Sequence, residues 1–315
     1  AEDEDSLQAA LKALVVELEP LPGVFDPRNA LDSDAPLIGE NPRDAEGHPR
    51  GNLLIDYIVR QADPDTVLAK CDVVVDDEYT TMHQEHAYIE TEGAVAVPWS
   101  GNSGVTVYAG CQSPFNARDN LVRTLGLAEE DVRVIQPYVG GAFGGKDDTM
   151  YQTIAQVAKL ALVAGRPVKM VLSREESLIA SYKRDAMVMK YKVGASKDGI
   201  LKACKFHGIV DSGGYSAITP FTAWRSTIHA MGPYRYEACH VDTDVVYTNN
   251  GYAGAFRGFG NTEVCYAIEM AVDDIASQLH LDPMDFRLKN CLRPGDTTSH
   301  GQKLGEDVAL VDCLE

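Results

Sequence analysis

The chain has 315 residues, of which 45% are hydrophobic, and this apolar content is enough for one large or two ordinary domains with a substantial core. Asp and Glu number 47 against 28 Lys and Arg, so the formal net charge is −19, and a field this negative repels a phosphate backbone and excludes nucleic acid as the expected partner. No apolar run approaches the roughly 20 residues that a membrane helix needs, and the first residues lack the basic and apolar regions of a signal peptide, so no membrane partner is expected either.

The N-terminal part of the chain is expected to contain one helix, a long irregular connection and several strands. Leu7 and Leu11 recur at helical spacing and predict a helix over 6–17, which Pro20 ends. Residues 22–50 are rich in Pro, Gly, Asp and Asn and predict an irregular connection. Dense β-branched and small residues predict strands over 73–75, 87–92, 94–97 and 104–109.

Helices and strands alternate through the rest of the chain. Pro114 in the first turn and Gly126 beyond the end predict a helix over 114–125. A strand over 132–139 leads into a glycine-rich turn, and an amphipathic helix over 151–164 follows it. Further strands are predicted over 168–172, 186–193, 201–210 and 241–247, and further helices over 263–279 and 283–290. The sum is an α+β fold of mixed sheets with interleaved helices.

The seven cysteines are scattered at irregular spacing, and none forms a Cys-x-x-Cys pair. This pattern encodes neither a zinc ribbon nor an iron–sulfur cluster in this segment. We therefore expect reduced, mostly buried thiols in a cytoplasmic protein.

Glycine is dense in residues 140–145, the glycine loop, which follows a predicted strand and precedes a predicted helix. Without Cβ atoms, backbone N–H groups can approach a ligand closely. Lys146 and the helix N-terminus favour an anionic group there. The spacing matches neither a Walker loop nor a Rossmann fingerprint, and a strained structural turn is the alternative.

Residues 251–260, the aromatic loop, place small residues around two phenylalanines and an arginine. Such rings suit a planar substrate, which they contact by offset stacking. A packed turn with both rings in the core fits the sequence equally well. A third position of interest is Gln112, at the end of a predicted strand, whose amide offers one acceptor and two donors beside an oxo or hydroxo ligand. The alternative for Gln112 is a cap or a surface side chain.

In order and spacing, these three segments resemble the molybdenum-binding subunit of the xanthine dehydrogenase and aldehyde oxidase family. The similarity runs from about Leu7 to the end of the chain. Further matching segments are Tyr88-Ile89-Glu90-Thr91, Gly165-Arg166-Pro167-Val168, Arg174-Glu175-Glu176 and Arg287-Leu288-Lys289-Asn290. So many ordered motifs identify the chain as a member of this molybdenum hydroxylase family.

The resemblance implies a fold like that of the molybdenum-binding domain of xanthine dehydrogenase. It implies a molybdenum–molybdopterin cofactor, a small heteroaromatic substrate that is hydroxylated with water as the oxygen source, and iron–sulfur clusters and FAD on other segments or subunits. The family's general base is a glutamate in a later domain, so we assign no catalytic residue here and expect this chain alone to be inactive. Glu90 and Glu92 match strand positions of the family and cannot replace that base.

The resemblance also assigns individual positions. Those that match cofactor contacts are Gln112, Gly141, Ala142, Phe143, Gly144 and Arg257. Gln112 is expected near the molybdenum without being a direct ligand. Those that match substrate contacts are Asp147, Arg225 and Phe259. Arg225 falls where purine-oxidising members have an arginine and aldehyde oxidases lack one, although a plain surface arginine is the alternative.

The resemblance further predicts how the chain is divided. Residues 1–70 are expected to be a remnant of the first domain of the molybdenum-binding subunit, together with the irregular connection. Residues 71–315 are expected to form the first molybdopterin-binding domain, with the second one absent. Either sequence is missing at both ends, or the chain belongs to a split subunit such as nicotinate dehydrogenases use.

Three functions remain open at this point. A purine-like substrate is favoured because of Arg225. Nicotinate or an aldehyde is the alternative, because Asp147 stands where purine enzymes have a glutamate, which reaches about 1.3–1.5 Å further. A non-catalytic scaffold that kept the fold is the third possibility, and such a protein would purify without molybdenum.

Overall fold

The computed structural model describes residues 1–39, 43, 44, 46–48 and 50–315. Its strands are β1 (Leu53–Gln61), β2 (Val73–Thr81), β3 (Gly93–Pro98), β4 (Val105–Ala109), β5 (Val132–Ile135), β6 (Val168–Val171), β7 (Lys183–Arg184), β8 (Ala186–Ala195), β9 (Leu201–Asp211), β10 (Ala238–Val246) and β11 (Ala253–Gly254). Its α-helices are α1 (Glu4–Ala13), α2 (Pro64–Leu68), α3 (Pro114–Leu125), α4 (Asp148–Ala164), α5 (Arg174–Ala180), α6 (Thr219–His229), α7 (Asn261–Gln278), α8 (Pro283–Asn290) and α9 (Leu310–Leu314).

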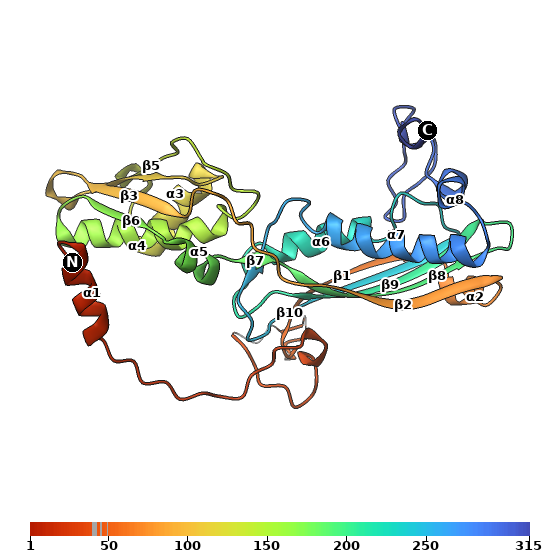
Figure 1. The fold of residues 1–315 in the computed structure, drawn as a ribbon, viewed down its shortest axis with the longest axis horizontal. Coiled ribbons are helices and arrows are strands. Elements are labelled where there is room, and N and C mark those ends of the chain that lie inside the picture. The colour runs from red at the N-terminus through yellow and green to blue at the C-terminus, as the bar shows by residue number, and fades with distance from the viewer. Residues whose placement is uncertain (40–42, 45, 49) are drawn as a thin grey trace.

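The molecule is elongated and has one large sheet at each end (Figure 1). One end holds a five-stranded sheet in the order β1-β10-β9-β8-β2, and the other a four-stranded sheet in the order β5-β4-β3-β6. The short pair β11-β7 lies between them. The expected α+β class of mixed sheets with interleaved helices is therefore confirmed.

The five-stranded sheet is mostly antiparallel and is covered by α6 and α7. Only its β9–β10 pair is parallel among the described strands. Helix α7 buries Val264, Ile268, Val272 and Ile275, which recur at spacings of three and four and so form one apolar stripe. That stripe packs in one cluster with buried side chains of the sheet such as Tyr191.

The four-stranded sheet has its own core, against which α3 and α4 pack. Helix α4 contributes Ile154, Val157 and Ala161, all fully buried, and β4 contributes Val105 and Val107 from the sheet. The glycine loop precedes α4, which packs on the four-stranded sheet, and the aromatic loop precedes α7, which packs on the five-stranded sheet. The start of each of these long helices is therefore tied to one of the two candidate loops.

Most of the expected elements are confirmed, and two strands need correction. Residues 87–92 form no strand, because Ala87 takes a positive φ of 50° and Arg174 donates to the carbonyl oxygens of Tyr88 and Ile89 in place of a partner strand. The strand expected over 132–139 ends at Ile135, the last residue that pairs with β4.

Several elements were not predicted. These are β1, α2, α5, α6 and α9, together with the short pair β7 and β11. Strand β1 lies before residue 71 and pairs with β10, so it belongs to the five-stranded sheet. The first helix occupies Glu4–Ala13 and buries no side chain; it ends before the predicted residue 17, because the backbone is already extended at Leu14. Within the expected irregular connection, residues 40–42, 45 and 49 lie outside the described residues.

All seven cysteines are free thiols, and Cys111, Cys204, Cys239 and Cys291 are buried. Burial raises the pKa of the Cys239 thiol to about 11, so this group is an unreactive part of the core. Among the described helices, none is both long and apolar enough to cross a membrane.

Candidate functional site

The glycine loop forms a tight turn in which three successive backbone N–H groups have no acceptor among the described residues. Gly141 and Gly144 take φ values of +96° and +103°, and Phe143 between them takes +54°. The turn closes where the Gly145 N–H donates to the Ala142 carbonyl oxygen at 2.8 Å. The N–H groups of residues 141–143 have no acceptor within the part of the chain that the structure describes. Three successive N–H donors in such a turn form a cradle for an electron-rich ligand.

Gln112 is attached to this loop by its side chain. Its Oε1 accepts a hydrogen bond from the Gly144 N–H at 2.9 Å, and its own N–H donates to the Lys146 carbonyl oxygen at 2.8 Å. Since a backbone N–H can only donate, the amide oxygen of Gln112 faces the loop and the NH₂ group is left with both donors. This arrangement suits an oxygen ligand next to the loop.

The aromatic loop contacts the glycine loop directly. The Arg257 N–H donates to the Phe143 carbonyl oxygen at 2.9 Å. The backbones approach so closely at Gly144 that a Cβ atom there would stand 2.5 Å from the Ala255 carbonyl oxygen. The expected meeting of Gln112, the glycine loop and the aromatic loop is therefore present in the structure.

Three buried residues bind carbonyl oxygens of these loops. Tyr182 donates its hydroxyl to Gly144, His86 Nε2 lies 2.7 Å from the oxygen of Ala255, and Arg184 Nη2 lies 2.8 Å from that of Arg257. Burial lowers the pKa of His86, so the ring is neutral and donates through Nε2. Sequence reasoning missed these residues, and only the run of polar residues before β8 offered a signal for two of them.

Two of the three expected substrate positions, Phe259 and Arg225, lie at the end of the aromatic loop and on α6, which packs against it. Phe259 is half-buried and has a φ of +51°. Ser226 of α6 donates to the Gly260 carbonyl oxygen at 2.9 Å, so α6 packs against the end of this loop. Arg225 is the preceding residue and is exposed, with its guanidinium carbon 5.5 Å from the centre of the Trp224 ring. It has no ion pair within the described residues.

Lys146 does not serve a ligand, contrary to the expectation from its place after the glycine loop. Its side chain is fully buried, and Nζ donates to Glu90 Oε2 at 2.6 Å. The Gly140 N–H donates to the same oxygen at 2.8 Å. The Lys146 ammonium, followed by this N–H, holds the pKa of Glu90 below its usual value. The Lys146–Glu90 pair therefore stabilises the two ends of the glycine loop.

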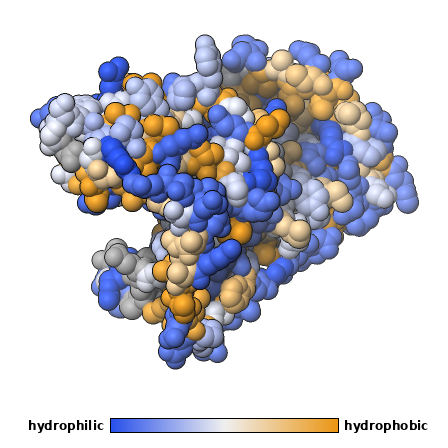
Figure 2. All heavy atoms as spheres, turned by 60° about the vertical axis from the view of Figure 1, so that its left-hand side comes forward, coloured by the Kyte–Doolittle hydropathy of each residue, from blue (hydrophilic) through white to orange (hydrophobic). Residues whose placement is uncertain are grey.

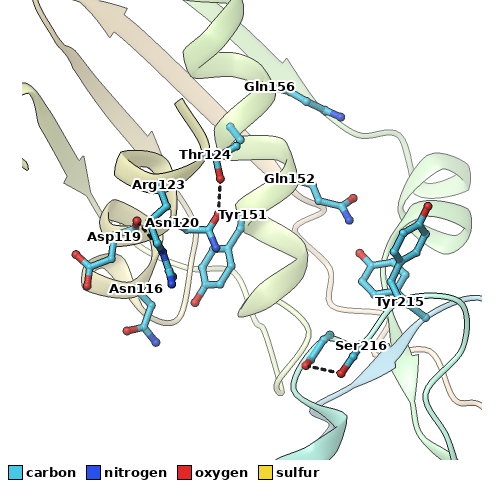
Figure 3. Close-up of a pocket in the computed structure, with 13 residues that line it drawn as sticks. Asn116, Asp119, Asn120, Arg123, Thr124, Tyr151, Gln152, Gln156, Tyr215 and Ser216 are labelled. Atoms are coloured by element: carbon cyan, nitrogen blue, oxygen red, sulfur yellow. Dashed lines mark hydrogen bonds between the residues drawn. The ribbon is translucent and has the colours of Figure 1, made fainter. Parts of the chain in front are cut away.

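Asp147 lies at the start of α4, where its Oδ1 accepts a hydrogen bond from the Tyr151 hydroxyl at 3.0 Å. Tyr151 also lines an open groove of about 810 Å³ between α3, α4 and the 215–217 segment (Figure 3). Gln112, Phe143 and Arg257 do not line this groove. We place the candidate site at the two loops, because the unpaired donors lie there.

The donors at the two loops fit a molybdopterin group. The glycine loop offers N–H groups that have no acceptor among the described residues and glycines where a Cβ would fill the space, and Gln112 offers an NH₂ group. The exposed Arg257 guanidinium has no ion pair within the described residues and suits an anion. The family model of the molybdopterin cofactor-binding domain matches residues 47–291. The chain belongs to this family.

Similar proteins include several molybdenum enzymes. The chain is 37% identical to the nicotinate dehydrogenase large molybdopterin subunit of Eubacterium barkeri, over all of this chain and 71% of that subunit. It is 36% identical to a probable xanthine dehydrogenase subunit of Bacillus subtilis, over 94% of this chain and 38% of that protein. The aldehyde oxidoreductase of Desulfovibrio gigas has the same fold, with a TM-score of 0.88 and 27% identity over all of this chain. The chain spans 33% of that solved chain.

Proposed function

We propose that this chain forms one wall of the molybdopterin site in an enzyme that hydroxylates an electron-poor nitrogen heteroaromatic, with water as the oxygen source. The observation that carries the proposal is the hydrogen bond from the Arg257 N–H to the Phe143 carbonyl oxygen, which joins the aromatic loop to the glycine loop beside Gln112. Iron–sulfur and flavin segments or subunits complete the enzyme in this proposal, and its location is the cytoplasm.

When bound, the molybdenum–molybdopterin group supplies the oxidising centre of this reaction. The residues of this chain orient it and the substrate. The N–H groups of residues 141–143 and the NH₂ group of Gln112 hold electron-rich atoms at the loop. Phe259 offers a ring for stacking on a planar substrate. Arg225 offers a planar fork of donors for a carbonyl or carboxylate oxygen of the substrate.

The remaining wall and the general base belong to other parts of the enzyme in this proposal. Exposed hydrophobic side chains near the loops are consistent with a face that another segment covers. Phe143 is 49% exposed, Phe115 75% and Phe221 63%. Figure 2 shows hydrophobic patches on the end of the molecule that carries the four-stranded sheet.

Among heteroaromatics, a purine-like compound is our first candidate substrate and nicotinate the second. The exposed Arg225 supports both, since each class carries oxygen acceptors. Asp147 supports nicotinate, because its shorter side chain is engaged by Tyr151 and has less reach towards a purine nitrogen. The similarity to a nicotinate dehydrogenase subunit points the same way.

Two substitutions in the complete enzyme test the substrate proposal. Arg225→Met removes the donor fork and should lower kcat/KM for hypoxanthine and nicotinate about 5- to 150-fold, which corresponds to about 1–3 kcal/mol for donors left without an acceptor, while benzaldehyde is spared. Asp147→Glu should shift the preference towards hypoxanthine. Arg133→Met, at an exposed position of β5, is the matched control and should change none of the ratios. Unchanged ratios in all three variants would remove the substrate proposal and leave the family membership intact.

A further inference from the structure

Arg184 lies at the junction between the two ends of the molecule and is only 7% exposed. It belongs to β7, whose register with β11 places it opposite Gly254. Its side chain continues past this short pair to the aromatic loop and to the first turn of α7. None of the roles that the family motifs imply falls on this residue.

The Arg184 guanidinium contacts four groups of the aromatic loop and α7. Nη2 donates to the Arg257 carbonyl oxygen at 2.8 Å. Nη1 donates to Glu263 Oε1 and to Thr262 Oγ1, each at 2.8 Å. The guanidinium carbon lies 4.1 Å from the centre of the Phe256 ring, within the range of a cation–π contact. One side chain therefore fixes the loop backbone, a loop ring and the start of the following helix.

This set of contacts requires an arginine. The side chains of Arg184 and Glu263 are 9% and 3% exposed, so each charge depends on the other in an interior that excludes water. A lysine in place of Arg184 would keep the charge, but its compact ammonium cannot reach the carboxylate and the carbonyl oxygen as a flat fork while stacking on Phe256. Arg184→Lys therefore keeps the positive charge and removes the planar arrangement of donors.

We propose that Arg184 is a positioning residue of the candidate site. It holds the aromatic loop so that the Arg257 N–H reaches the Phe143 carbonyl oxygen and Phe259 is presented to a planar substrate. This inference rests on the proposed function as far as the substrate is concerned, but the holding of the loop concerns this chain alone. Arg184 itself lies behind the loop and contacts no reacting group in this proposal.

The first readout is cleavage by trypsin after Arg257. This side chain is exposed, yet the N–H and the carbonyl oxygen of Arg257 are both bound, to Phe143 and to Arg184. A protease needs the segment to open locally, and losing the bond to Arg184 makes that opening easier. In the assembled complex with the full-length chain, Arg184→Lys should speed this cleavage about tenfold at a temperature well below unfolding.

The second readout is the split between KM and kcat for the substrate that the wild-type complex accepts. A loosened Phe259 weakens stacking in the substrate complex, so Arg184→Lys should raise KM about five- to tenfold with a smaller change in kcat. Arg287→Lys is the matched control. Arg287 is also a partly buried arginine, paired with Glu269 and Asp273 at 2.6 Å each, but it lies on α8 away from both loops. It should lower the unfolding temperature without changing cleavage after Arg257 or KM.

The outcomes separate the two proposals. Wild-type cleavage rates in Arg184→Lys overturn the inference, and so does faster cleavage with an unchanged KM. If the wild-type complex hydroxylates no heteroaromatic, the proposed function fails, and the cleavage comparison still decides whether Arg184 holds the loop. If Arg184→Lys yields no folded protein, Phe256→Leu keeps the hydrogen bonds of Arg184 and removes the ring's contacts with Arg184 and His86, and it must show the same faster cleavage for the inference to stand.

Discussion

Replacing Gly144 by alanine tests the contact between the two loops most sharply. Gly144 takes a φ of +103°, which L-residues avoid, and a Cβ atom there would stand 2.5 Å from the Ala255 carbonyl oxygen and 2.8 Å from the carbonyl carbon. Backbone atoms cannot turn aside as a flexible side chain can. The loops must therefore separate, which weakens the bond from the Arg257 N–H to Phe143 and the bond from the Gly144 N–H to Gln112.

The expected loss of stability has two parts. Forcing a non-glycine residue into this region of φ costs about 1–3 kcal/mol, and the overlap with the aromatic loop adds about 1–3 kcal/mol. Gly301→Ala isolates the first part, because Gly301 has a similar φ of +91° and nothing within 4 Å of its Cβ position. The difference between the two variants is thus about 1–3 kcal/mol and belongs to the loop contact.

Thermal unfolding and molybdenum analysis of the assembled complex measure this difference. At about 2–4 °C per kcal/mol for domains of 150–250 residues, Gly144→Ala should unfold several degrees below Gly301→Ala. It should also carry less molybdenum, since the cradle is distorted. Equal unfolding temperatures and equal molybdenum contents in the two variants would refute the reasoning.

Two further predictions concern the same region. Asp185 is buried against Thr219 and Thr222 of α6, near Glu263 and His83, and burial raises its pKa to about 7. The folded state therefore holds the proton more tightly than the unfolded state does. The stability that Asp185 contributes is present below its ordinary pKa of about 4 and is lost as the pH rises through about 7. Thermal unfolding from pH 4 to 8 should show this fall in the wild-type protein and a smaller one in Asp185→Asn, and parallel curves would contradict the burial argument. The isolated chain should fold but retain little molybdopterin, because under the proposed function it supplies one wall of the site. Near-stoichiometric cofactor after purification from cofactor-producing cells would show that this wall is sufficient.

Local signals made part of the fold predictable. The helix over residues 114–125 was predicted with its observed bounds, because Pro114 fits the first turn and Gly126 takes the left-handed conformation that ends it. Strand β1 was not predicted, since its partner β10 lies about 180 residues away and a short apolar run does not indicate which strand it pairs with. The strand predicted over residues 87–92 is wrong. Tyr88 and Ile89 favour strands by residue type, but their carbonyl oxygens accept hydrogen bonds from Arg174.

The candidate site shows the same division. Glycine density and loop spacing indicated where backbone donors and rings would meet, and the structure joins those segments. The partners of single charges were not predictable. The position of Lys146 predicts an anionic ligand, but its side chain binds Glu90, 56 positions earlier in the chain. For Arg184 the only signal was the run of polar residues before β8, and it did not indicate the partners, because the groups that Arg184 binds lie 73–79 positions further along the chain.

The most direct test of the central claim is the molybdenum and pterin content of the complete complex that contains this chain, purified from cells that make the cofactor. The account predicts near-stoichiometric molybdenum and pterin, with a marked decrease in Gly144→Ala and little change in Gly301→Ala. A folded, assembled complex that contains neither molybdenum nor pterin would contradict it and would leave the chain as a scaffold that has kept the fold.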